Sequence, residues 1–378
     1  MDELLEIFIF KIVILNYIVS HREFCQYEMD YSKVIWVGPI GHRKEINDRG
    51  AGSIWYKNSS YCELTALHKI WQNSNNDDLP IGFSHYRRQL LLKKIPYEDN
   101  LFGHFSKTSI VPIEKILSTE MVSLSSQELE NLSNFDAVLP YEEKICQSVR
   151  DHYISKHGYE SWQLMINVLK NKGEVQVIEC LQDARNQSAR WGNIFLLKKN
   201  LFVDLCEWLF PLIEEIERKA NRILGFNDLR IYGYLAERLT TAYFRNLIQK
   251  EGLKFIERPT LLIDFENQQL WKRINAMGEN QRLWIWGSGA FGEKFLNGLK
   301  LLGFENRVLG FIDSDVGKSN KSFLSSKVLS KESFFDTDMQ SNKTFIVVAS
   351  SGWRQIAEEL KVRGLNHSRD FYCLKGIS

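Results

Sequence analysis

Four consecutive side chains suit the binding of a diphosphate: His85, Tyr86, Arg87 and Arg88. Two adjacent guanidinium groups donate bidentate hydrogen bonds to phosphate oxygens and stay charged at any working pH. The four residues follow a short apolar run at 80–84, and ligands of open α/β sheets lie beyond the carboxyl ends of strands. We expect this segment to contact the diphosphate of a nucleotide sugar. The alternative is a structural cluster of ion pairs on a loop.

A second polar group stands at the expected start of a helix. Lys57 and Asn58 shortly precede Tyr61 and Glu63, and the free N–H groups of a helix start favour an anion or an acceptor oxygen. Farther along, the amide of Asn193 could reach a sugar hydroxyl. We predict that these residues help to bind the donor. The competing interpretation is structural, because a glutamate suits a first helical turn and an asparagine commonly caps a strand.

A third group combines carboxylates with arginines: Asp228, Arg230, Glu237 and Arg238. An inverting sugar transfer needs a carboxylate that takes the proton of the acceptor hydroxyl. Glu237 and then Asp228 are our candidates for this base, with Arg230 as a further donor contact. Alternatively, Glu237 and Arg238 belong to the solvated face of a helix.

A glycine turn in the last quarter of the chain has the spacing of a nucleotide-binding turn. Gly287, Gly289 and Gly292 lie between an apolar run at 283–286 and a helical pattern. Such a turn lets the backbone approach a pyrophosphate at a helix N-terminus, and Asp313, at the end of the next apolar run, is placed to meet a ribose hydroxyl. We predict a nucleotide site here. A structural or oligomerising module is the alternative.

An α/β fold must position these groups, because apolar runs of strand length alternate with helical patterns, as in parallel sheets. Strands are predicted at residues 11–19, 33–38, 80–84, 136–140 and 193–198, and helices at 61–73, 201–218 and 231–249, with further helices within 148–183; residues 255–262 close the first domain. The predicted organisation is a first domain at 1–263, a linking helix at 264–282 and a smaller Rossmann-like domain at 283–378.

Composition excludes several classes of protein. The 378 residues are more than one hydrophobic core usually holds, and a net charge of +1 gives no overall field that would attract nucleic acid. The six cysteines lack the spacing of a metal site or a disulfide framework. The apolar stretch at 4–19 contains Glu6 and Lys11, and a charge inside a spanning helix costs about 2.5–3.5 kcal/mol. We therefore expect a buried first strand there, not a membrane span.

Seven ordered motifs together resemble the DUF4422 family, which is associated with bacterial capsular and exopolysaccharide glycosyltransferases. They are WYKN at 55–58, YCELTAL at 61–67 with Trp71, FSHYRR at 83–88, FDAVLP at 135–140, GNIF at 192–195, CEWLFP at 206–211 and YLAERL at 234–239. Several motifs in order are far more specific than any one of them. The resemblance covers roughly residues 10–263. It implies a GT-A-like nucleotide-sugar fold and, for some relatives, galactofuranosyl transfer.

The chain departs from the expected pattern in two places. Ser20-His21-Arg22 stands where such chains have a Thr-His-Lys type of tripeptide. No Asp-x-Asp follows the strand where GT-A enzymes hold Mn²⁺ or Mg²⁺; the segment that begins at His85 stands there instead. Because guanidinium charge can neutralise a leaving diphosphate, we expect transfer without a metal. A divalent ion held by His85 and a distant carboxylate stays open.

The expected function is a glycosyltransferase of capsule, exopolysaccharide or O-antigen synthesis. Its donor would be a UDP-linked sugar, and its acceptor a lipid-diphosphate-linked oligosaccharide at the inner face of the plasma membrane, with the protein cytoplasmic or bound peripherally. One alternative is a nucleotide-dependent sugar oxidoreductase or epimerase that uses the glycine turn, although residues 283–378 lack a Tyr-x-x-x-Lys pair. Another is a non-catalytic regulator that binds nucleotide sugars.

Overall fold

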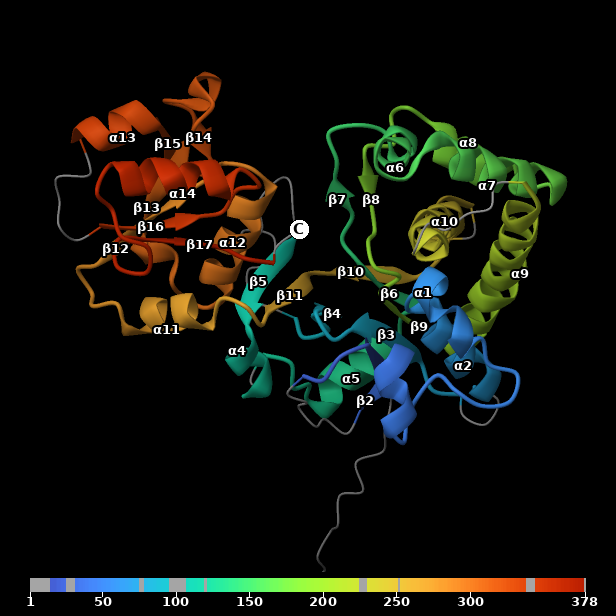
Figure 1. The fold of residues 1–378 in the computed structure, drawn as a ribbon. Coiled ribbons are helices and arrows are strands. Elements are labelled where there is room, and N and C mark those ends of the chain that lie inside the picture. Colours follow the sequence, from blue (N-terminus) through green and yellow to red (C-terminus); the bar gives the residue numbers. More distant parts are fainter. Residues whose placement is uncertain are drawn as a thin grey trace, which may run out of the picture. The chain divides into compact units, whose positions relative to one another are not determined.

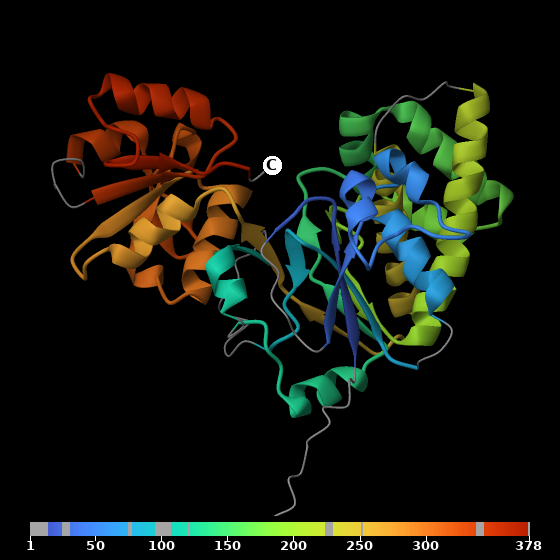
Figure 2. The same cartoon turned by 60° about the horizontal axis from the view of Figure 1, so that its bottom comes forward.

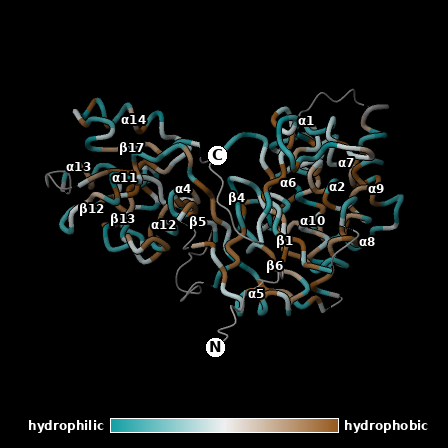
Figure 3. The backbone as a smooth tube through the Cα atoms, turned by 90° about the horizontal axis from the view of Figure 1, so that it is seen from below, coloured by the Kyte–Doolittle hydropathy of each residue, from teal (hydrophilic) through white to brown (hydrophobic). Residues whose placement is uncertain are grey.

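The computed structural model describes residues 14–24, 31–74, 78–94, 107–118, 121–223, 230–250, 252–337 and 344–376. The chain divides into two compact units (Figure 1). The first unit comprises Met1–Tyr86, Ser123–Pro140 and Ile145–Arg258, and the second comprises Arg87–Val122, Tyr141–Lys144 and Pro259–Ser378. Each unit has its own hydrophobic core, and apolar segments gather inside both (Figure 3).

The first unit is built on a six-stranded sheet of order β10-β6-β9-β3-β1-β2. Its strands are β1 (Leu15–Ser20), β2 (Ser32–Trp36), β3 (Ile81–His85), β6 (Ala137–Pro140), β9 (Phe195–Leu197) and β10 (Phe255–Arg258). Only β9 runs against its neighbours β3 and β6; the other described pairings in this sheet are parallel. The carboxyl ends of five strands therefore share one edge of the sheet with the amino end of β9.

The helices of the first unit share one hydrophobic core with its sheet, except for the helix at Ser126–Ser133, whose buried side chains lie outside that core. They are α1 (Asn58–Tyr61), α2 (Leu64–Asn73), α5 (Ser126–Ser133), α6 (Val149–His157), α7 (Tyr159–Asn171), α8 (Val175–Gln182), α9 (Lys199–Ile223) and α10 (Ile231–Lys250), with short 3-10 turns at Gly38–Arg43 and Trp55–Lys57 and a short strand β8 (Ser188–Ala189). Helix α10 packs among α7, α8 and α9 (Figure 1), and its Leu235 and Leu239 are fully buried. This burial lets α10 bring polar side chains into the interior.

The helix predicted at 61–73 is broken in the structure. Cys62 has φ 53°, which ends α1, and Glu63 is the N-cap of α2. Apolar periodicity continues across the break, because Tyr61 and Leu64 both face the core. The predicted helix is thus confirmed over Leu64–Asn73, and it starts three residues later than predicted because a single left-handed residue leaves no mark on an apolar pattern.

The second unit contains a six-stranded sheet of order β14-β15-β13-β12-β16-β17 and a three-stranded sheet of order β4-β11-β5. The strands are β4 (Arg88–Leu90), β5 (Thr108–Pro112), β11 (Thr260–Asp264), β12 (Arg282–Trp286), β13 (Val308–Asp313), β14 (Ser322–Phe323), β15 (Ser326–Ser330), β16 (Thr344–Val348) and β17 (Phe371–Cys373), with a short β7 (Glu143–Lys144). The larger sheet is parallel except for its edge strand β14. The prediction of an α/β fold with a second, Rossmann-like parallel domain is confirmed.

Helices cover both faces of the larger sheet of the second unit (Figure 2). They are α11 (Gln268–Ala276), α12 (Ala290–Leu301), α13 (Lys331–Thr337) and α14 (Trp353–Val362), whereas α4 (Ile113–Leu117) packs against β5 and β11 of the smaller sheet. Side chains of α11 and α12 share one core with Leu283 and Ile285, and those of α13 and α14 share the other with Trp284 and Trp286. This alternation along β12 is what a strand buried on both faces requires.

The division into units differs from the predicted domain boundaries. Strand β11 lies across the predicted boundary at 263, and pairs with β4 and β5. Helix α11 is part of the core of the second unit, because Leu270, Trp271 and Ile274 are buried there. Residues 264–282 are therefore not a linker. Strand β5 packs on α12 so closely that a Cβ on Gly298 would meet the carbonyl oxygen of Ile110.

The apolar N-terminal stretch ends in β1, as predicted for residues 15–19, whereas residues 4–13 lie outside the described part of the chain. Within the described ranges, no helix combines the length and the apolar character needed to cross a membrane.

Candidate active site

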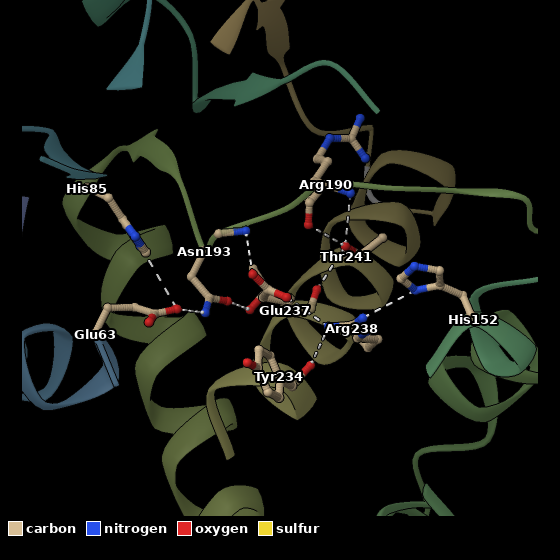
Figure 4. A network of polar contacts seen from close by, with 11 residues as sticks. Glu63, His85, His152, Arg190, Asn193, Tyr234, Glu237, Arg238 and Thr241 are labelled. Atoms are coloured by element: carbon tan, nitrogen blue, oxygen red, sulfur yellow. Dashed lines mark hydrogen bonds and ion pairs between the residues drawn. The ribbon is translucent and has the colours of Figure 1, made fainter. Parts of the chain in front are cut away.

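Polar side chains from distant parts of the first unit meet at the shared edge of its sheet (Figure 4). His85 is the last residue of β3, and Asn193 lies two residues before the start of β9. Glu63 is the N-cap residue of α2, and Glu237 lies on α10. Parallel strands place their carboxyl ends, and the loops that follow, at one edge. The structure therefore brings together residues that the sequence analysis had placed in three separate groups.

One left-handed turn holds both carboxylates. Gly192 has φ 85° and Asn193 φ 50°, a conformation that glycine adopts freely and asparagine more readily than most residues. The backbone N–H of Gly192 donates to Oε1 of Glu237 at 2.9 Å, and Nδ2 of Asn193 donates to Oε1 of Glu63 at 2.8 Å. The turn thus fixes the spacing between Glu63 and Glu237.

Asn193 is a structural connector. Its side chain is 3% exposed, and its Oδ1 accepts a hydrogen bond from Oγ1 of Thr240 at 3.0 Å. Because both ends of the amide have protein partners, Asn193 orients Glu63, and it does not face a sugar as we had expected. Nε2 of His85 lies 3.9 Å from Oε1 of Glu63, and the His85 side chain is 22% exposed.

Glu237 is the counterion of a buried arginine. Nη1 of Arg238 donates to Oε2 of Glu237 at 2.8 Å and to the carbonyl oxygen of Tyr234 at 3.0 Å. The guanidinium lies 4.7 Å from the ring centroid of Trp191 and 5.3 Å from that of Tyr153. Burial lowers the pKa of Arg238, and the charge of Glu237 opposes that effect. A solvated helix face, the alternative interpretation of this pair, is excluded because Arg238 is 2% exposed.

Arg190 anchors the start of the same turn. Its Nε donates to the carbonyl oxygen of Pro140 at 3.0 Å, and its Nη2 to Oε1 of Glu257 at 2.6 Å. Its backbone N–H donates to Oγ1 of Thr241 on α10 at 3.2 Å. These contacts tie the turn to the ends of β6 and β10 and to α10, so the carboxylates stand on rigid elements.

Cationic side chains stand around this edge. His21 and Arg22 follow β1, and the Arg22 guanidinium lies 5.0 Å from the ring centroid of Tyr86. Nε of Arg230 lies 3.4 Å from Sγ of Cys62, next to Glu63 in the chain. Nearby protein atoms partly desolvate the His21 imidazole and lower its pKa, and the charges of Arg22 and Arg230 lower it further, as expected for neighbouring cations. His21, Arg22 and Arg230 are exposed, and we call them the cationic rim.

Arg230 was predicted from the sequence as a site residue, whereas His21 and Arg22 were not. The signal that could have found them is their place after an apolar strand, the same argument that selected His85. Tyr86, a predicted donor contact, is 7% exposed and lies edge-on to His21, with ring centroids 5.3 Å apart. Tyr86 therefore packs against two residues of the rim, His21 and Arg22.

Three residues that we predicted to bind the sugar donor, Lys57, Asn58 and Tyr61, instead make contacts within the protein that hold α1 in position. Nζ of Lys57 lies 2.6 Å from Oε2 of Glu217 on α9, and the hydroxyl of Tyr61 donates to the same oxygen at 2.9 Å. Tyr61 is fully buried, so a donor cannot reach it. Nδ2 of Asn58 donates to the carbonyl oxygen of Cys62 at 2.8 Å. A 3-10 turn leads directly into α1, so the start of this helix does not present the free N–H groups that we expected for an anion.

The predicted tetrapeptide is divided between the units. His85 and Tyr86 end a segment of the first unit, and Arg87 and Arg88 begin a segment of the second. The carbonyl of Arg87 accepts from the N–H of Ile263 at 2.8 Å, and Arg88 pairs in β4. Contact of these two arginines with a donor stays a prediction. Asp228, the second predicted base, lies outside the described residues.

The glycine turn of the second unit has the predicted geometry. Gly287 has φ 124°, and a Cβ there would collide with the carbonyl oxygen of Ala349. A Cβ on Gly292 would collide with the carbonyl oxygen of Gly287, whereas Gly289 faces open space. Both close approaches require glycine at these two positions.

Asp313 is engaged by the turn itself. Its Oδ2 accepts from the N–H of Ser288 at 2.9 Å and from Nζ of Lys318 at 3.1 Å, and its Oδ1 accepts from the N–H of Asp315 at 2.9 Å. Burial would raise the pKa of Asp313, but the hydrogen bonds, first of all from Ser288, lower it. These hydrogen bonds give Asp313 a structural role, because it holds the glycine turn and the loop after β13 in place. A nucleotide at this turn stays a prediction.

A metal site was left open by the sequence, with His85 as one ligand. In the part of the chain that the structure describes, no three or more His, Cys, Asp and Glu side chains are grouped so that they could hold an ion. His85 and Glu63 alone would supply two protein ligands.

The fold of this chain is similar to that of a known glycosyltransferase, and its sequence matches a known family. The structure is similar to the apo structure of WbbM, a bifunctional glycosyltransferase, with a TM-score of 0.56 and 21% sequence identity. The match covers 89% of this chain and 59% of that chain, so the chain spans little more than half the length of WbbM. At this identity the likeness concerns the fold. No curated protein matches the sequence significantly. Residues 16–250, more than half of the chain, match the family described as a domain of unknown function, DUF4422, and the chain therefore belongs to the DUF4422 family.

Proposed function

We propose that the first unit is a glycosyltransferase that moves a sugar from a nucleotide-sugar donor to a saccharide acceptor. One observation carries the proposal: two carboxylates, fixed by a single turn, stand beside a cationic rim at the carboxyl edge of a parallel sheet. The chemistry needs both features, because a diphosphate must be neutralised as it leaves and polar groups must orient the sugar and the attacking hydroxyl. The fold likeness to WbbM and the family motifs support the same class of reaction.

Arg22 and Arg230 are the proposed diphosphate ligands. Both are exposed at the edge, and both are pre-oriented, Arg22 by the ring of Tyr86 and Arg230 by Cys62. A guanidinium that is already held in place loses less conformational entropy when it binds a phosphate. We propose that their charge does what a divalent ion does in related folds, so that transfer proceeds in the presence of a chelator.

The finer assignment follows the family resemblance. The proposed donor is UDP-linked, with galactofuranose as one candidate sugar. The proposed acceptor is a lipid-diphosphate-linked oligosaccharide, met by a cytoplasmic protein that docks peripherally on the membrane during capsule, exopolysaccharide or O-antigen synthesis.

Calorimetric titration of the whole chain with UDP and with uridine tests the proposal. A charged hydrogen bond contributes about 1.5–3 kcal/mol, so Arg230→Gln and Arg22→Gln should each weaken UDP binding by about 10-fold to 100-fold. Uridine affinity should not change. The matched control is Arg218→Gln on α9, an exposed arginine paired with Glu215. Unchanged UDP affinity in the double variant would refute the proposed diphosphate site.

Turnover separates a transferase from a regulator. Release of UDP from a panel of UDP-hexoses that includes UDP-galactofuranose, with alkyl glycosides as acceptors, is expected only from an enzyme. UDP-sugar binding without any release would favour the non-catalytic regulator, and binding of NAD without UDP would favour the oxidoreductase.

A further inference from the structure

We propose that His85 is the catalytic base of this transfer and that Glu63 orients it. The inference rests on the proposed function, and it deepens that function by naming the group that takes the proton of the acceptor hydroxyl. Asn193 and Thr240 are positioning residues that act through Glu63.

A chain of contacts runs from α10 to the end of β3 (Figure 4). Oγ1 of Thr240 donates to Oδ1 of Asn193 at 3.0 Å, and Nδ2 of Asn193 donates to Oε1 of Glu63 at 2.8 Å. The same Glu63 oxygen lies 3.9 Å from Nε2 of His85. The inner three members are 5%, 3% and 9% exposed, whereas the His85 side chain is 22% exposed. This series of contacts is thus buried at Thr240 and reaches solvent at the His85 imidazole.

Each inner member has one orientation. Because an ionised carboxylate only accepts hydrogen bonds, the amide NH₂ group of Asn193 must face Glu63, and the amide oxygen then accepts from the Thr240 hydroxyl. Glu63 is the N-cap residue of α2, yet its carboxylate makes no capping hydrogen bond to that helix. Its carboxylate is directed toward Asn193 and His85 instead. A carboxylate used in this way, at a position where it could have capped a helix, points to a task outside the helix.

The carboxylate of Glu63 orients the imidazole of His85, as a general base requires. A hydrogen on Nε2 facing the carboxylate leaves the lone pair on Nδ1, and the carboxylate stabilises the imidazolium that forms. At 3.9 Å the contact is longer than a hydrogen bond, and such contacts commonly shorten when substrate binds.

The proposed step balances within the two substrates and His85. The acceptor oxygen forms a bond to the anomeric carbon, and its proton passes to Nδ1 of His85. The bond between the anomeric carbon and the phosphate oxygen breaks, and the nucleoside diphosphate leaves with the electron pair. The imidazolium then releases its proton to solvent. No oxidant or other reactant is required.

Glu237, the base predicted from the sequence, is less suited to this step. The N–H of Gly192 and the guanidinium of Arg238 each engage one of its oxygens, and the buried charge of Arg238 needs that carboxylate ionised. We assign Glu237 the role of a counterion that holds the turn in place.

The test compares His85→Gln, Glu63→Gln and Glu237→Gln in the whole chain, with His367→Gln, an exposed histidine of the second unit, as the matched control. UDP release from UDP-hexoses in the presence of alkyl glycosides gives kcat and KM, and calorimetry gives the affinity for UDP. General base catalysis contributes about 100-fold to 10,000-fold, so His85→Gln should lower kcat by at least ~100-fold while the UDP affinity stays within about threefold. His367→Gln should match the wild type.

The pH profile reports on orientation by Glu63. The acid limb of kcat/KM reports protonation of the base, and loss of the neighbouring carboxylate favours the neutral imidazole. Glu63→Gln should therefore move the acid limb to lower pH. Thr240→Val, which removes one hydroxyl, should move the limb in the same direction by less, and it serves if Glu63→Gln does not fold.

The outcomes are distinct. If the wild type releases UDP and His85→Gln keeps kcat within about threefold of it, the base is misassigned while the proposed function stands. If Glu237→Gln folds and loses far more kcat than His85→Gln, the base is Glu237. If the wild type neither binds UDP nor releases it from any UDP-hexose, this inference and the proposed function both fail.

Discussion

Replacing Arg238 by methionine is expected to destabilise the first unit by about 3 kcal/mol. Breaking a buried ion pair by removing one partner costs roughly 3–5 kcal/mol, because a charge is left uncompensated. Arg238 is 2% exposed, and its Nη1 lies 2.8 Å from Oε2 of Glu237. After the substitution Glu237 keeps the N–H of Gly192 at 2.9 Å and a side chain that is 14% exposed. These remaining contacts place the cost at the lower end of the range, and methionine fills the space of the arginine stem, so that no large cavity adds to it.

Hydrogen exchange followed by mass spectrometry is the appropriate assay, because a protein of two units need not unfold in one step. About 3 kcal/mol corresponds to a rise of roughly 100-fold in exchange through global opening for peptides of α10. Peptides of α12, in the second unit, should be unaffected. Arg218→Met, which breaks an exposed ion pair with Glu215 on α9, should leave both sets of peptides unchanged. The double variant with Glu237→Gln should lose less than the sum of the single variants.

A change of less than tenfold in the α10 peptides, or an equal change in α12, would refute the assignment of Arg238 and Glu237 as a mutually dependent pair. It would also remove the reason for excluding Glu237 as the base.

Three further predictions concern other parts of the molecule. Gly292→Ala should unfold the second unit, because a Cβ there would collide with the carbonyl oxygen of Gly287, whereas Gly289→Ala should leave its thermal unfolding unchanged; equal melting of the two variants would contradict this. Burial, and then a neighbouring arginine, lower the pKa of His152 below 6.5, so the unfolded chain binds more protons and stability should fall as pH drops below 6.5. In denaturant titrations across pH 5–7, His152→Gln should show a smaller loss than the wild type. Tyr61→Phe removes one hydrogen bond to Glu217 and should cost about 1 kcal/mol without changing UDP affinity; a weaker affinity would return Tyr61 to the donor site.

The elements with strong local patterns could be predicted from the sequence. Helix α10 (Ile231–Lys250) begins and ends within a residue of the predicted range, and β12, the glycine turn and α12 follow one another as expected. Apolar periodicity and glycine spacing are local signals in the sequence. They predict an element correctly wherever that element buries its apolar face against its neighbours.

Long-range pairing could not be predicted. Strands β4 and β5 both pair with β11, which lies far along the chain, and this pairing places the segment after Tyr86 in the second unit. Nothing near residue 87 marks this change. For the same reason the tetrapeptide at 85–88 looked like one phosphate site, although its members belong to two units.

The candidate site was predicted in its residue types but not in their roles. Glu63, Asn193 and Glu237 were all selected as polar residues at element ends, and the structure brings them together. Which of them faces a substrate depends on partners such as Thr240 and Arg238, whose distances no spacing in the sequence encodes. Buried counterions and consecutive left-handed residues become visible only in three dimensions.

A crystal structure of the whole chain with UDP tests the central claim most directly. We predict that the diphosphate lies at the carboxyl edge of the first sheet, with an oxygen within hydrogen-bonding distance of the guanidinium of Arg22 or Arg230. A diphosphate bound instead at the glycine turn that begins at Gly287, with the edge at His85 free of ligand, would contradict the account.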